Sequence, residues 1–323
     1  MKILIFGAGG VGSVVGAFLA RTGNDVSLLG RAWHLDAVEK QGLLITGIWG
    51  DYRMKAFECY RNAEELQKKN PAFDLIILTV KSNDTEQAVR ELLPFIKENT
   101  TLLSLQNGLG NVEAILASGV KPEQYLAGRV IFGVELSPGI AKVTVNADDI
   151  LIGPLPGVTP KANVYSLVQS FNASKLPTRG VTDILTHLWA KVIYNCALNP
   201  VCSLHEMPYG KILESRETHE MMKRVIRECY AVGLKKGIVL DPPTAEVFIE
   251  RMEQKLIPST AAHSPSMLQD LKRGKRTEID ALNGAISRYA MELGISAPEN
   301  EKLTRQVHGL EIKRRSEGEA RRI

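Results

Sequence analysis

KILIFGAGGVG, residues 2–12, decides the fold of this 323-residue chain. An apolar strand leads directly into a Gly-x-Gly-x-x-Gly turn, and the apolar residues that follow predict a helix. In such a unit Gly7 permits the tight turn, Gly9 lets the backbone approach a pyrophosphate, and Gly12 allows close helix-to-strand packing. The context predicts a dinucleotide-phosphate site formed by six consecutive residues: Gly7, Ala8, Gly9, Gly10, Val11 and Gly12.

The hydrophobic pattern divides the rest of the chain into two parts. Up to about residue 154, short β-branched runs alternate with amphipathic stretches, which is typical of a parallel sheet covered by helices. Beyond Val181, long helical periodicities dominate. We therefore expect an α/β protein, with an N-terminal Rossmann-type parallel-sheet domain over residues 1–180 and an all-helical domain over residues 181–323.

Individual elements follow from the same pattern. The candidate strands are Lys2–Phe6, Val26–Leu29, Asp74–Val80, Thr101–Leu105, Leu126–Val134 and a meander over Lys142–Ile152. The candidate helices are Asp84–Ile96, Ala162–Phe171, Asp183–Leu198, Arg216–Lys236, Pro243–Glu253, Ile279–Glu292 and Glu299–Ile312. The charged segment Lys313–Ile323 is expected to be a frayed tail.

The composition is that of an ordinary globular protein. A net charge of +4 is small for this length, so nucleic acid is not an expected partner. No apolar run approaches the roughly 20 residues that cross a bilayer, and no export signal precedes the first strand, so we expect a cytoplasmic protein without a membrane partner. The four cysteines lack metal-ligand spacing, which predicts reduced thiols and no metal.

Three residues follow predicted strands at their carboxyl ends, where ligands of open α/β sheets bind. An NAD site would place an acidic residue after the second strand, but this chain has Arg31 there. A guanidinium suits a 2′-phosphate through charge-assisted hydrogen bonds, so NADP (NADPH) is favoured over NAD. Lys81 is expected to reach a phosphate or the adenosine, and Asn107 to lie on the nicotinamide side.

An otherwise apolar helix in the second part carries Lys191, Asn195 and Asn199 at a spacing of four residues, on one face. A polar stripe on a buried helix must face compensating groups or a cleft. The alternative is a lysine whose stem packs on apolar surface while its ammonium reaches water. Glu278, in the run Thr277-Glu278-Ile279-Asp280, either complements the dipole of a helix that begins there or charge-stabilises the ammonium of Lys191.

Together these motifs resemble those of the ketopantoate reductases, or 2-dehydropantoate 2-reductases, over nearly the whole chain. The glycine turn is shared by many enzymes. The resemblance also rests on Arg31, Lys81 and Asn107 in their local contexts, on the stripe at Lys191, and on Ser266-Met-Leu-Gln-Asp270 with Thr277–Asp280. The stripe and the last two motifs are the specific part of the match.

The resemblance implies NADPH-dependent reduction of 2-dehydropantoate to (R)-pantoate, a step of pantothenate biosynthesis, in a cleft between an NADP-binding and a substrate domain. It makes Lys191 the general acid that protonates the forming alkoxide, since negative charge grows on the carbonyl oxygen as hydride arrives. Glu278 would lie close to Lys191 and the nicotinamide ribose, and Asn107 between cofactor and substrate. The implied substrate-binding residues are Asn107, Lys191, Asn195, Asn199 and Ser266.

Two departures from the family pattern leave the identity of the 2-oxo acid open. His263 and Tyr209 stand where the family commonly carries asparagines that contact the substrate. One alternative is a reductase of the same family that acts on a different 2-oxo acid. Another is a non-catalytic NADPH-binding sensor, which would not be expected to keep Lys191 and Glu278. A homodimer is compatible with the sequence, which does not fix the oligomeric state.

Overall fold

The computed structural model describes residues 1–55 and 57–320. Its contacts divide the chain into two compact units: Met1–Gln106 with Asn111–Ile184, and Asn107–Gly110 with Leu185–Ile323. The segment Asn107–Gly110 therefore belongs to the second unit, although it closely follows a strand of the first.

The first unit is built on an eight-stranded sheet with the order β12-β11-β8-β7-β6-β1-β2-β5. Neighbouring strands are parallel, except that β11 pairs with β8 in the antiparallel sense. The run from β5 to β8 has the doubly wound order of a Rossmann-type sheet, as predicted. The strands are β1 (Lys2–Phe6), β2 (Asp25–Leu29), β5 (Glu58–Tyr60), β6 (Leu75–Leu78), β7 (Thr101–Ser104), β8 (Tyr125–Arg129), β11 (Ile150–Gly153) and β12 (Thr178–Gly180).

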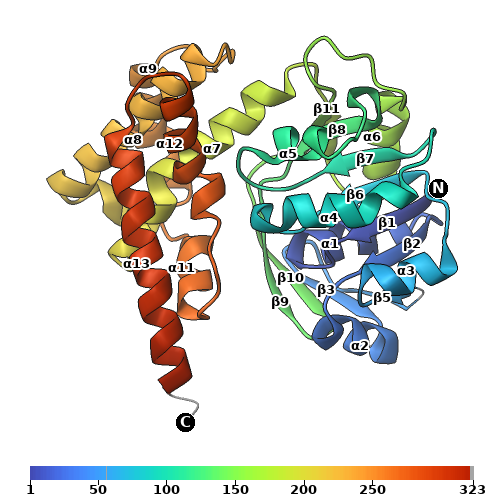
Figure 1. Cartoon of the computed structure of the whole chain (residues 1–323). Coiled ribbons are helices and arrows are strands. Elements are labelled where there is room, and N and C mark those ends of the chain that lie inside the picture. The colour runs from blue at the N-terminus through green and yellow to red at the C-terminus, as the bar shows by residue number, and fades with distance from the viewer. Residues whose placement is uncertain (56, 321–323) are drawn as a thin grey trace. The chain divides into compact units, whose positions relative to one another are not determined.

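A second sheet, with the order β4-β3-β10-β9, accompanies the first. Its strands are β3 (Leu43–Gly47), β4 (Tyr52–Met54), β9 (Phe132–Ser137) and β10 (Ile140–Asn146). Helix α1 (Gly10–Ala20) contacts β1 and β2 of the large sheet and β3, β9 and β10 of the small one (Figure 1). Because sheets cover it on two sides, α1 is buried continuously over residues 12–19, as its largely apolar sequence requires.

Several expected boundaries in this unit need correction. The single strand predicted over Leu126–Val134 is wrong, because β8 ends at Arg129 and β9 begins at Phe132 in the other sheet. The helix predicted over Asp84–Ile96 is α4 (Thr85–Leu92) followed by a 3₁₀ turn, since Pro94 has no N–H to continue an α-helix. The other helices are α2 (Ala32–Gln41), α3 (Ala63–Lys69), α5 (Asn111–Ala117) and α6 (Val164–Ala173).

The second unit contains only helices and turns among its described residues, as predicted. Helices α8, α12 and α13 pack against one another (Figure 1). The elements are α7 (Ile184–Leu204), η4 (Tyr209–Leu213), α8 (Arg216–Lys235), α9 (Ala245–Arg251), η5 (Met252–Leu256), α10 (Ile257–Ser259), α11 (Ser266–Lys272), η6 (Ile279–Ala281), α12 (Asn283–Glu292) and α13 (Pro298–Ala320). Over residues 1–55 and 57–320, we find no helix with the length and apolar character that crossing a membrane requires.

Two helix predictions in this unit are wrong. The helix expected over Ile279–Glu292 is interrupted at Leu282, whose φ of −106° and ψ of −107° are not helical. The frayed tail expected over Lys313–Ile323 is helical as far as Ala320, because α13 continues and Arg314 forms an ion pair with Glu206. Residues 321–323 lie outside the described part of the chain.

Pro200 lies inside α7 and, having no N–H, leaves the carbonyl of Cys196 without its helical partner. The buried side chain of Asn283 replaces that partner: its Nδ2 donates to the Cys196 carbonyl (3.1 Å) and to Oδ1 of Asn300 (2.9 Å). Nδ2 of Asn300 donates to Oε2 of Glu228 (2.8 Å). This network connects α7, α8, α12 and α13. It fixes α7 in the part of the helix that carries the polar stripe.

Replacement of Asn283 by leucine should therefore destabilise the protein. The Cys196 carbonyl would lose its side-chain donor, and Oδ1 of Asn300 would keep only the weak thiol donor of Cys229 (3.8 Å). Because an unpaired buried group costs about 1–3 kcal/mol, we expect the free energy of unfolding to fall by about 3 kcal/mol. Urea unfolding followed by circular dichroism measures this change. Ser287→Ala is the matched control in α12, because this hydroxyl donates only to the Asn283 carbonyl. Equal stability of the two variants would show that the network contributes nothing.

Candidate functional site

The glycine turn between β1 and α1 is held against the end of β2. The N–H groups of Gly7 and Ala8 both donate to the Leu29 carbonyl, at 2.9 and 2.8 Å. Gly7 has a φ of +107°, which side-chain-bearing residues rarely adopt. A Cβ on Gly12 would lie 2.5 Å from the Gly7 carbonyl oxygen, so only glycine fits there. The turn thus has the closed backbone path that a pyrophosphate-binding turn needs.

Arg31 is placed directly beside this turn. A Cβ on Gly30 would lie 2.9 Å from Cβ of Ala8, which shows how closely the end of β2 approaches the glycine turn. Arg31 follows as the exposed N-cap residue of α2. Buried His34 contacts Ser13 of α1 through Nε2 (3.0 Å), so the first turns of α1 and α2 are joined. Burial lowers the pKa of His34, which favours a neutral ring in this contact.

Lys81 lies shortly after β6, the strand next to β1, and its carbonyl accepts from the Asp84 N–H (2.8 Å). Gln106, just past β7, donates from Nε2 to the Val80 carbonyl (3.0 Å) and to the Thr85 hydroxyl (2.8 Å). The ends of β6 and β7 are thereby tied together. Lys81 thus shares the carboxyl edge of the sheet with the glycine turn and Arg31.

In the second unit the structure brings together Lys191, Asn107 and Glu278. Nζ of Lys191 donates to Oδ1 of Asn107 at 2.5 Å. Nδ2 of Asn107 donates to Oε2 of Glu278 at 3.2 Å. Because the ammonium binds the amide oxygen and the carboxylate binds the amide nitrogen, the orientation of Asn107 is fixed by opposite charges on its two sides.

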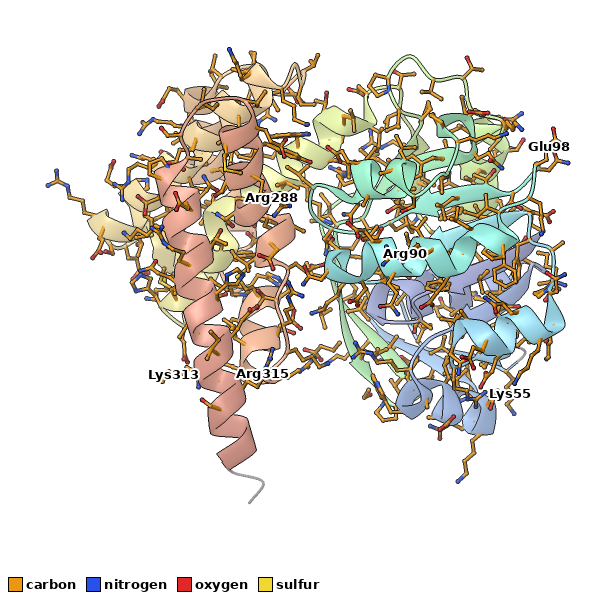
Figure 2. The ribbon with its side chains drawn as sticks, in the orientation of Figure 1. Lys55, Arg90, Glu98, Arg288, Lys313 and Arg315 are labelled. Atoms are coloured by element: carbon orange, nitrogen blue, oxygen red, sulfur yellow. The ribbon has the colours of Figure 1, made fainter. Side chains whose placement is uncertain are left out.

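The backbone supports this trio. The N–H of Leu109 donates to the carbonyl of Ala281 (2.7 Å), and a Cβ on Gly108 would lie 2.6 Å from Cβ of Ala281. Arg288 of α12, labelled in Figure 2, donates to the Asp280 carbonyl (3.0 Å). The Thr277 hydroxyl accepts from the Ile279 N–H (3.3 Å). The segment that carries Asn107 and the segment that carries Glu278 are thus held together by main-chain contacts.

The remaining predicted site residues lie further along the second unit. Asn195 is half-buried on α7, one turn beyond Lys191, and Asn199 is buried one turn further on. Oδ1 of Asn199 accepts from the Tyr209 hydroxyl at 2.5 Å. Ser266 is the first residue of α11, outside the Lys191 trio.

Two contacts at the site escape sequence reasoning. The hydrogen bond between Tyr209 and Asn199 joins residues of different elements. Its only signal in the sequence is that Tyr209 departs from the family pattern. The contact between Ser13 and His34 has no signal in the sequence, because neither residue belongs to a motif.

Family models match most of the chain. Residues 3–157 match the model described as "Ketopantoate reductase PanE/ApbA", and residues 183–311 match "Ketopantoate reductase PanE/ApbA C terminal". Among curated proteins, the 2-dehydropantoate 2-reductase of Aquifex aeolicus is 37% identical, over 97% of each chain. The 2-dehydropantoate 2-reductase of Pyrococcus horikoshii is 36% identical, over 93% of this chain and 94% of its own.

Solved structures agree with these matches. A PanE/ApbA family ketopantoate reductase from Ralstonia eutropha is 31% identical with a TM-score of 0.85, covering 97% of this chain and 99% of its own. A D-mandelate dehydrogenase in complex with NADH and anilino(oxo)acetate is 28% identical with a TM-score of 0.86 at the same coverage. From its sequence motifs, the fold of both units and these full-length relatives, the chain belongs to the ketopantoate reductase family.

Proposed function

We propose that this protein reduces 2-dehydropantoate to (R)-pantoate with NADPH, the step of pantothenate biosynthesis that its curated relatives are named for. The observation that carries the proposal is the trio of Lys191, Asn107 and Glu278. In it the ammonium of Lys191 is held by the Asn107 amide, and that amide is held by Glu278. A positioned cation is what the reduction of a ketone needs, because negative charge develops on the carbonyl oxygen.

The residues of the first unit fit a phosphorylated dinucleotide. The closed turn at Gly7–Gly12 offers backbone N–H groups at the start of a buried helix, which suits a pyrophosphate. Arg31, exposed beside the turn, is assigned to the 2′-phosphate, and Lys81 to a phosphate or the adenosine. NADPH bound there would supply the hydride. Asn107 and Glu278 are assigned to its nicotinamide end.

Lys191 is the proposed general acid. Its ammonium donates a proton to the substrate carbonyl oxygen, so the product leaves as an alcohol rather than an alkoxide. Asn107 holds the ammonium through Oδ1, and Glu278 orients Asn107 through Nδ2. Asn195, Asn199 and Ser266 are assigned to binding of the 2-oxo acid. The retained Lys191 and Glu278 argue against a non-catalytic sensor.

Reduction of a different 2-oxo acid is the second candidate function. Tyr209 and His263 stand where the family commonly has substrate-contacting asparagines, and their rings are 5.3 Å apart. A D-mandelate dehydrogenase of similar fold forms a ternary complex with NADH and anilino(oxo)acetate. This likeness favours testing substrates with larger apolar substituents.

A steady-state assay decides between these functions. NADPH oxidation is followed with 2-dehydropantoate, 3-methyl-2-oxobutanoate and phenylglyoxylate, and the highest kcat/KM is expected for 2-dehydropantoate. A higher kcat/KM for phenylglyoxylate would favour the second candidate. If none of the three substrates supports NADPH oxidation, both candidate functions are contradicted. The cytoplasmic location and the homodimer stay predictions. Light scattering would measure the oligomeric state.

A further inference from the structure

Asn199 marks one end of the polar stripe on α7. It lies eight residues beyond Lys191, about 12 Å along the helix axis at 1.5 Å per residue. In the proposed function Lys191 meets the reacting carbonyl, so Asn199 is expected to meet a different group of the substrate. Asn199 is 4% exposed, and a buried amide must be hydrogen-bonded in a defined way.

An asparagine side chain can point either end towards a substrate, because its oxygen accepts and its nitrogen donates. Tyr209 removes this freedom. Its hydroxyl donates to Oδ1 of Asn199 at 2.5 Å, and burial raises the pKa of Tyr209 well above its ordinary value, so the phenol keeps its proton. The amide nitrogen of Asn199 therefore points away from Tyr209. Among the described residues, no acceptor receives a hydrogen bond from this nitrogen.

Tyr209 is itself held by the chain around it. Its N–H donates to the His263 carbonyl (3.1 Å), and the N–H of Gly210 donates to the Ala261 carbonyl (2.9 Å). The ring of Tyr194 packs edge-on against that of Tyr209, at 5.8 Å between centroids. The hydroxyl of Tyr194 contacts Thr260 Oγ1 (2.9 Å) rather than Asn199.

We infer that Tyr209 is a positioning residue that orients the Asn199 carboxamide, so that Nδ2 donates to an acceptor oxygen of the 2-oxo acid other than its ketone oxygen. The inference rests on the proposed function, because it takes α7 to be the substrate-binding helix. The oxygen is either the substrate carboxylate or the hydroxyl at the far end of 2-dehydropantoate. Both are acceptors, and substrates that differ in one of them distinguish the two.

Tyr209→Phe tests the inference in the full-length enzyme. Without the hydroxyl, the amide of Asn199 is free to turn, and loss of one oriented hydrogen bond should raise KM for 2-dehydropantoate about tenfold while kcat and the Kd of NADPH stay unchanged. Asn199→Ala should raise KM by a similar factor, and the double variant should raise it no further, since the two residues act as one unit. Tyr194→Phe is the matched control, because it removes a hydroxyl from the same cluster without touching Asn199.

A second substrate identifies the oxygen. An equal rise in KM for 3,3-dimethyl-2-oxobutanoate, which lacks the hydroxyl, assigns Nδ2 to the carboxylate, whereas a rise confined to 2-dehydropantoate assigns it to the hydroxyl. A Tyr209→Phe enzyme with the KM of the wild type, or effects that simply multiply in the double variant, would overturn the inference alone. A wild-type enzyme that turns over no 2-oxo acid would overturn the proposed function with it.

Asn199→Asp keeps the inference testable if Tyr209→Phe does not fold. The carboxylate retains an acceptor for the Tyr209 hydroxyl but has no N–H to offer the substrate. We expect KM to rise about thirtyfold, which corresponds to about 2 kcal/mol for the loss of a donor facing an acceptor oxygen. An unchanged KM in this variant would equally overturn the inference.

Discussion

Replacement of Lys191 by alanine is expected to lower kcat about 1,000-fold, the middle of the range for a positioned general acid, and to leave the affinity for NADPH unchanged. The reason lies in the trio of the second unit. The ammonium of Lys191 is the cation held by Asn107, which in turn is held by Glu278. Alanine removes both the proton and the positive charge that the developing alkoxide requires. The residues assigned to the phosphates of NADPH, which are the glycine turn, Arg31 and Lys81, lie in the first unit, so the affinity for NADPH should be kept.

Steady-state kinetics and NADPH titration by fluorescence measure the two quantities separately. Lys272→Ala is the matched control, because it removes an exposed lysine of the same unit from α11. A Lys191→Ala enzyme with more than a tenth of the wild-type kcat would exclude Lys191 as the essential proton donor. Loss of NADPH binding in the same variant would instead assign Lys191 to the cofactor.

Replacement of Arg31 by aspartate should change the preference between cofactors. Arg31 lies at the end of β2, beside the glycine turn, with its side chain exposed. A guanidinium paired with a 2′-phosphate makes charge-assisted hydrogen bonds worth about 1.5–3 kcal/mol each, whereas a carboxylate repels the phosphate and can accept from the ribose hydroxyls of NADH. We expect the ratio of kcat/KM for NADPH to kcat/KM for NADH to fall about 100-fold.

The control for this change is Arg90→Asp, a charge reversal at an exposed arginine of α4 in the same unit (Figure 2). Both cofactors are assayed at one ionic strength, because screening weakens exposed charge interactions. An unaltered ratio in Arg31→Asp would mean that another residue holds the 2′-phosphate. A wild-type enzyme that already prefers NADH would contradict the assignment of Arg31 outright.

The fold could be predicted where one periodicity runs without interruption. The strand from Lys2 to Phe6 is observed with the predicted bounds, and helix α8 ends one residue from its predicted end. The small sheet could not be predicted, because strands such as β4 (Tyr52–Met54) are too short to show alternation and β3 pairs with β10, far along the sequence. The break between β8 and β9 at residues 130–131 could not be predicted either, because no local pattern indicates that the chain passes from one sheet to the other there.

At the candidate site, sequence spacing predicted that Lys191, Asn195 and Asn199 share a face of one helix, because four residues are nearly one turn. Spacing along the chain does not predict which distant side chains meet. Asn107 falls within the predicted NADP-binding domain, residues 1–180, yet it is part of the helical unit and bonds Lys191 and Glu278 there. Tyr209 reaches Asn199 through a turn whose path depends on main-chain bonds to His263 and Ala261.

The enclosure of α1 by two sheets has a consequence for how a cofactor is received. A phosphate turn in an exposed loop must be immobilised when ligand arrives, and that loss of freedom weakens binding. Here residues 12–19 are buried on all sides and the N–H groups of Gly7 and Ala8 are already committed to the Leu29 carbonyl. In the proposed function the pyrophosphate therefore meets a preorganised turn, and its favourable contacts would go into affinity rather than into ordering the protein.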